Sequence, residues 1–111
     1  MVIIGFSTKS SKILPNIFCK QFKHCAVIAR DGTEFMLYQF VSYGHIEKIR
    51  LRARDIKILR QCGWYFVYLP CELPSNFPRR TMTCVNMAKN AIKMHAPFIQ
   101  TPDALYCAIA E

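Results

Sequence analysis

The period of the apolar positions changes several times along the chain, and each change predicts a new element. Alternating or continuous β-prone runs predict strands, whereas apolar residues three and four positions apart predict helices. The predicted strands are residues 2–6, the two arms of 24–40, 44–51 and 64–69. The predicted early helices are residues 10–22 and 53–61, the second ended by Gly63. The first of these is basic and amphipathic, so it either packs on its own domain or contacts a membrane or substrate.

The second half of the chain predicts a loop followed by two helices. PCELPSNFPRR, residues 70–80, holds three prolines and is expected to form a loop. Thr81 is the expected cap of a helix that begins near residue 82 and ends near residue 95. Thr101-Pro102-Asp103 is a strong helix start because it combines a cap, a first-turn proline and an acid.

Length and composition predict one α+β domain over residues 1–111, with a small antiparallel sheet packed against helices. Apolar residues make up 52% of the chain, which excludes a disordered tail. No apolar run is long enough to span a membrane, and the short N-terminal run lacks a basic leader. We therefore expect no transmembrane segment and no signal peptide, and a protein of the cytoplasm, or of the host cytosol if it comes from a phage.

The net charge of +8 favours an anionic partner such as nucleic acid, acidic lipid or cell-wall polymer, although an ordinary solvated surface explains it equally well. Among the cysteines no C-x-x-C spacing occurs, which argues against a zinc ribbon or a thioredoxin-like site. Without an export signal, free thiols are expected rather than disulfides. The six cysteines are at positions 19, 25, 62, 71, 84 and 107.

Cys84 differs from the other cysteines because it lies in the first turn of the predicted late helix. Unpaired N–H groups and the helix dipole favour a thiolate there, and Arg79 and Arg80 lie just upstream. A thiolate is the nucleophile of cysteine hydrolases and acyltransferases. The same position also suits an inert cysteine that packs a helix start.

His24 is the expected partner base. His95 is on the same predicted helix as Cys84, roughly 16 Å along its axis, and His45 begins a polar strand that is expected to face solvent. A hairpin turn centred on Asp31-Gly32 would place His24 directly opposite Gln39, on one face of the sheet. Gln39 could then orient the imidazole by a hydrogen bond. Cys25 would point to the other face.

Four segments together resemble the circularly permuted papain-like thiol enzymes, the branch that groups NlpC-type cell-wall endopeptidases with lecithin–retinol acyltransferase-like proteins. They are IIGFS, FKHCAVIARDG, TCVNMAKNAI and TPDALY. In that branch the histidine strand precedes the cysteine helix, as His24 precedes Cys84. The resemblance implies Cys84 as nucleophile, His24 as base, and Gln39 as the third polar residue, where the family often carries His, Asn or Gln. The cysteine at position 25 departs from the small or β-branched residue usual beside the base.

The resemblance implies nucleophilic acyl transfer through a thioacyl intermediate, with the backbone N–H of Cys84 as part of the oxyanion hole. No metal or cofactor is required. The substrate could be a peptide, a cell-wall peptide or an acyl lipid, and specificity would come chiefly from the 70–80 loop. Two alternatives stay open: a non-catalytic basic module that binds nucleic acid or an anionic surface, and a family member that has lost turnover.

Overall fold

The computed structural model describes residues 1–8, 24–40, 45–75, 77 and 83–110. In this part the chain forms five strands and three helices. Their order along the chain is β1 (Val2–Ser7), β2 (His24–Asp31), β3 (Glu34–Phe40), β4 (Ile46–Leu51), α2 (Ala53–Gln61), β5 (Tyr65–Leu69), α3 (Cys84–Ala91) and α4 (Pro102–Ile109). The predicted helix over residues 10–22 lies outside the described residues.

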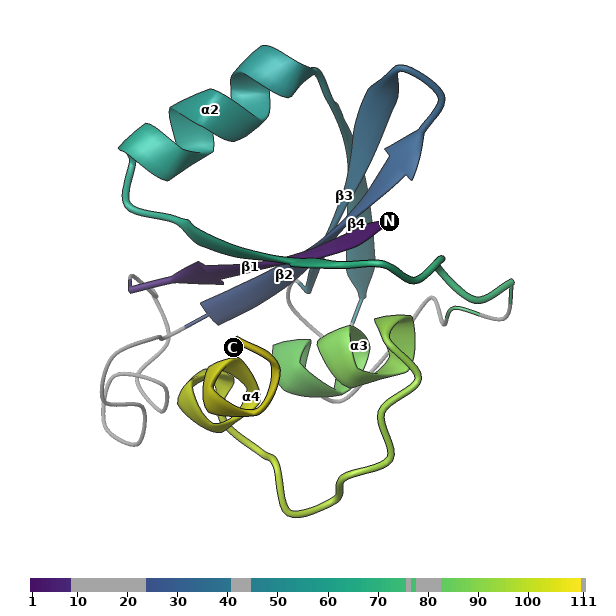
Figure 1. Cartoon of the computed structure of the whole chain (residues 1–111), viewed down its shortest axis with the longest axis vertical. Helices are drawn as coiled ribbons and strands as arrows, with labels where there is room; N and C mark the ends of the chain where they lie inside the picture. The colour runs from purple at the N-terminus through teal and green to yellow at the C-terminus, as the bar shows by residue number, and fades with distance from the viewer. Residues whose placement is uncertain (9–23, 41–44, 76, 78–82, 111) are drawn as a thin grey trace.

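The five strands form one antiparallel sheet in the order β4-β3-β2-β1-β5. Helix α2 covers one face, and α3 and α4 lie side by side against the other (Figure 1). The α+β prediction is therefore confirmed, as are the strands expected over residues 2–6 and 64–69. No helix in the described part of the chain has the length and apolar character needed to cross a bilayer.

Each face of the sheet has its own apolar core, because successive side chains of a strand point to opposite faces. Cys25 and Val27 of β2 point toward α3 and α4, whereas Ala26 and Ile28 point toward α2. The core on the α3 and α4 face is the larger one. Its fully buried members from strands and helices include Val2, Ile4, Phe6, Cys25, Val27, Met87, Ala88, Ala91 and Leu105.

The turn between β2 and β3 lies one residue later than the sequence predicts. Asp31 pairs with Glu34, so the two turn residues are Gly32 and Thr33 rather than Asp31 and Gly32. Only Gly32 has a positive φ there, 66°, which is the requirement of a type II′ turn with glycine first. The predicted register of the hairpin is therefore wrong by two residues, and every facing pair changes while every residue keeps its face.

The two C-terminal helices begin at capped positions. Thr83, not Thr81, caps α3, and its Oγ1 accepts the N–H of Asn86 at 3.1 Å. Thr101 caps α4 as predicted, with Pro102 at its first position. Helix α3 is shorter than predicted, because the chain leaves helical geometry after Ala91.

The side chain of Lys89 holds the segment that follows α3 against the helix. This side chain is 6% exposed, and Nζ donates to the carbonyls of Ala96 and Ile99, at 3.0 and 2.7 Å. Lys93 takes a positive φ of 57°, which turns the chain away from the helix axis. The segment between α3 and α4 is thus bound back onto α3 by a buried cation.

Candidate active site

Cys84 is the first residue of α3, so its backbone N–H is one of the helix N–H groups without an acceptor inside the helix. The residue is half-buried and packs against the core that α3 shares with β1 and β2. The positive end of the helix dipole lies at this position and favours a negative charge. The predicted place of Cys84, in the first turn after the loop, is confirmed.

His24 is the first residue of β2 and therefore lies at one end of the sheet. His24 and Ala26 are two residues apart in β2, so their side chains point to the same face of the sheet, the face that α2 covers. On that face the imidazole lies edge-on to the indole of Trp64, with ring centroids 6.1 Å apart. Because the strand begins here, the same ring also reaches Cys84 on the opposite layer.

The pKa of the Cys84 thiol is lowered to about 4. The largest cause is a hydrogen bond with the side chain of Cys25, and a hydrogen bond with His24 and the charge of its ring act in the same direction. Burial opposes these effects, because desolvation disfavours the charged form. The site therefore favours a thiolate beside an imidazole, which is the state that a thiol nucleophile requires.

One ring nitrogen of His24 is left for another partner. Nε2 is buried, and among the described residues it has no hydrogen-bond partner. A buried donor without a partner is costly, so Nε2 marks the place where a third polar group would complete the site.

Gln39 is not directly opposite His24, because of the shifted hairpin register. Val27 pairs with Tyr38, so continuing the ladder places Ala26 opposite Gln39. The two-residue shift preserves the face, and Gln39 becomes a diagonal neighbour of His24. Diagonal neighbours lie roughly 7–8 Å apart, within reach of a long side chain. The residue directly across from His24 is Ser7 of β1.

Three neighbours of the site were not predicted from the sequence. Cys25 points to the face opposite that of His24, as predicted, but α3 packs against the face of Cys25 rather than that of His24, and the hydrogen bond of Cys25 with Cys84 depends on that packing. Ser7 of β1 pairs with His24, and Trp64, the residue before β5, contacts its ring, because β1 pairs with both β2 and β5. The sequence does hold one signal for Trp64, namely Gly5. A Cβ at Gly5 would lie 3.0 Å from the Trp64 ring, so glycine leaves room for the indole.

The other sequence-predicted groups take no part in this cluster. His45 is exposed, as predicted, and begins the segment that leads into β4. His95 is also exposed, and it follows α3 instead of lying on it. Arg79 and Arg80 lie outside the described residues. Within the described ranges, no group of three or more His, Cys, Asp or Glu side chains is arranged to hold a metal ion.

Comparisons with known proteins assign no function to the chain. No protein-family model matches the chain, and neither a curated protein nor a solved structure matches it. The resemblance to permuted papain-like enzymes therefore stays a prediction. The chemistry of Cys84, His24 and their neighbours is the basis for the function proposed below.

Proposed function

We propose that this protein is a small cysteine-dependent hydrolase or acyltransferase that acts on an amide or ester. The observation that carries the proposal is the contact between the Cys84 thiol and His24 at the first residue of α3. A lowered thiol pKa, an adjacent imidazole and a helix N-terminus together form the arrangement that activates a nucleophilic cysteine. Two further features, the donor from Cys25 and the wall formed by Trp64, hold the pair in place.

The reaction begins when the Cys84 thiolate attacks the carbonyl carbon of the substrate. A C–S bond forms, and the carbonyl π electrons move to the oxygen, where first-turn N–H groups of α3 stabilise the charge. His24 donates its proton to the leaving amine or alcohol as the C–N or C–O bond breaks. Water or an acceptor amine then attacks the thioester, and His24 takes its proton. The Cys84 thiolate then leaves, and the product acid or amide is released.

The circularly permuted papain-like arrangement is part of what we propose. It is supported by the order of the two groups, since the strand that carries His24 precedes the helix that carries Cys84. The packing of α3 against the face of Cys25 is also consistent with it. In this proposal Gln39, diagonal to His24 on the same face of the sheet, is the positioning residue for the imidazole, and it makes no hydrogen bond with Nε2 in this structure.

An electrophilic acyl probe tests the proposal directly. The wild-type protein is expected to be acylated at Cys84, and Cys84→Ala is expected to remove the label while circular dichroism shows an intact fold. His24→Ala should slow acylation about a hundredfold or more, the usual contribution of a general base. Cys62→Ala and Cys107→Ala, which alter exposed cysteines, are the matched controls and should label normally.

Two results would contradict the proposal. Labelling mainly at Cys62 or Cys107 would show that Cys84 is an ordinary packed thiol. Labelling of Cys84 at an unchanged rate in His24→Ala would show that the imidazole does not act on it. Peptide mapping of the labelled protein by mass spectrometry distinguishes these results from the expected one.

A further inference from the structure

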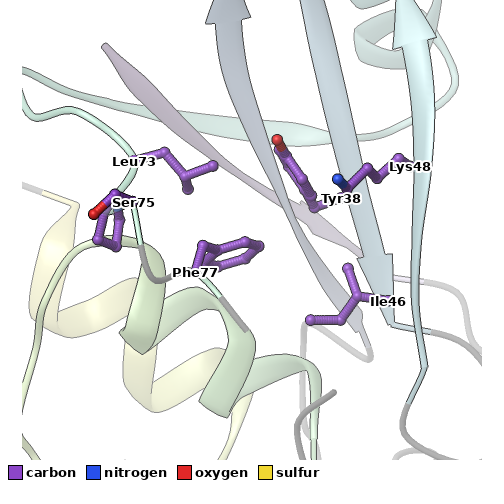
Figure 2. A pocket seen from close by; sticks show the side chains of 7 residues that line it. Tyr38, Ile46, Lys48, Leu73, Ser75 and Phe77 are labelled. Atoms are coloured by element: carbon purple, nitrogen blue, oxygen red, sulfur yellow. The ribbon is translucent and has the colours of Figure 1, made fainter. Parts of the chain in front are cut away.

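A cavity of about 290 Å³ opens on the α3 and α4 face of the sheet, away from the Cys84–His24 pair. Figure 2 shows its two walls: Tyr38, Ile46 and Lys48 from β3 and β4, and Leu73, Ser75 and Phe77 from the segment that follows β5. Since a water molecule occupies about 30 Å³ in the liquid, the cavity has room for roughly ten non-hydrogen atoms.

The lining combines aromatic and aliphatic side chains with the polar groups of Lys48, Tyr38 and Ser75. The ring of Phe77 lies edge-on to that of Tyr38, with centroids 5.1 Å apart, and both pack toward Ile46 and Leu73. Lys48 places its Nζ 5.9 Å from the centroid of the Tyr38 ring. Aromatic and aliphatic side chains beside a few polar groups suit a ligand that has both an apolar part and a charged part.

Within the described part of the chain, the ammonium of Lys48 takes part in no ion pair. Among the ion pairs of the described residues, each carboxylate is held by Arg50, Arg52 or the chain terminus, and none by Lys48. Burial first, and the charge of Asp31 second, raise the pKa of Tyr38, so its hydroxyl stays protonated and can donate a hydrogen bond. The cavity therefore offers the Lys48 cation and the Tyr38 hydroxyl to an anion, and Ser75 adds a second hydroxyl to the lining.

The register of the sheet gives the position of this cavity relative to the nucleophile. Val27, Tyr38 and Lys48 form one row across β2, β3 and β4. Cys25, whose side chain contacts Cys84, is two residues before Val27 on the same face. Lys48 and Cys25 are two strand spacings apart across the sheet and two residues apart along it, which gives a separation of about 12 Å. A substrate segment of three extended residues spans a similar distance, roughly 10 Å.

We propose that this cavity is a substrate subsite for an apolar group that carries a carboxylate, with Lys48 and Tyr38 binding the anion and Ile46, Leu73 and Phe77 binding the apolar part. The inference rests on the proposed function for its role in catalysis, since it places the anchored group about three residues from the acyl carbon at Cys84. The carboxylate can belong to an apolar peptide residue or to an acyl chain.

Binding is measured on Cys84→Ala, so that the result does not depend on turnover. The two probes are N-acetyl-leucine, for the peptide source, and octanoate, for the acyl source, each titrated by NMR. Their neutral partners are N-acetyl-leucinamide and octanamide. We expect at least one acid to bind with shifts at Tyr38 and Phe77, and its neutral partner to bind about tenfold more weakly or not at all, the usual effect of losing one charge-assisted hydrogen bond.

Lys48→Met removes the cation while keeping the length of the side chain, and it should weaken binding of the acid about tenfold. Lys57→Met is the matched control, because Lys57 is exposed on α2, which covers the opposite face. Equal binding of acid and amide, or unchanged binding in Lys48→Met, would overturn the assignment of the anion site. Absence of binding by both acids would overturn the subsite. Either failure leaves labelling of Cys84 in the wild-type protein unaffected, so it is distinguishable from failure of the proposed function.

Discussion

The imidazole of His24 and the indole of Trp64 meet edge-on, at an angle of 80° and with centroids 6.1 Å apart. The contact fixes one side of the ring whose other side faces Cys84. Trp64→Ala should therefore let the imidazole turn away and slow acylation of Cys84 by about tenfold to a hundredfold, because reactivity depends steeply on alignment. The rate of probe labelling measures this effect.

Trp64→Phe is the control for that prediction. It keeps an aromatic edge for His24 and should label within about threefold of the wild type. A normal labelling rate in Trp64→Ala would show that the indole only fills space on the α2 face. Thermal unfolding of both variants separates loss of alignment from loss of fold.

Removing the thiol donor at position 25 should raise the pKa of Cys84. In the folded protein this pKa is about 4, and the hydrogen bond with Cys25 is its largest cause. The rate of Cys84 alkylation by iodoacetamide, followed from pH 4 to 9, should have its midpoint near pH 4 in the wild type and at higher pH in Cys25→Ala. Cys25→Ser keeps a donor and should keep the low midpoint. Identical midpoints for the alanine and serine variants would contradict the donor role.

The same lowered pKa predicts how stability depends on pH. A free thiol titrates near 9 in the unfolded chain, so between about pH 4 and pH 9 the unfolded state binds a proton at Cys84 that the folded state does not. This stabilisation is complete above pH 9 and is lost as pH falls toward 4. The free energy of unfolding of the wild type, compared with that of Cys84→Ala across this range, should show an additional rise with pH. A constant difference between the two proteins would contradict the lowered pKa.

Gln39 should act on His24 without contacting the nucleophile. Gln39→Met keeps the length of the side chain but removes its polar atoms, and it should slow acylation of Cys84 severalfold and shift its pH profile. Gln39→Glu restores an acceptor for Nε2–H and should recover most of the rate. A larger loss in Ser7→Ala than in Gln39→Met would instead assign the orienting role to Ser7, the residue directly across from His24.

Lys89 should be a structural rather than a functional cation. Lys89→Met leaves the carbonyls of Ala96 and Ile99 without their donor, which should lower the free energy of unfolding by about 1–3 kcal/mol. Urea denaturation measures this loss, and Lys57→Met on the exposed surface of α2 should change it by less than about 0.5 kcal/mol. Equal unfolding midpoints for the two variants would show that the buried ammonium does not hold the segment to α3.

Local patterns predicted much of the fold because they depend on neighbours in the sequence. Periodicity predicted helix α2, and β-prone runs predicted strands β1 and β5. The capping residues predicted the start of α4. Cys84 at a helix start was predicted for the same reason. The end of α3 was not, since it depends on a positive φ at Lys93 and on the buried bonds of Lys89.

The amino-acid sequence alone determined which residues could be a thiolate and a base, and that Cys25 and His24 point to opposite faces of their strand. Only the tertiary structure decided what surrounds them. A type II′ turn at Gly32 moved Gln39 to a diagonal position, while the strand order placed Ser7 and Trp64 beside the imidazole. The packing of α3 brought Cys84 to Cys25 and His24. Register and strand order come from long-range packing of the whole core, which no local period encodes.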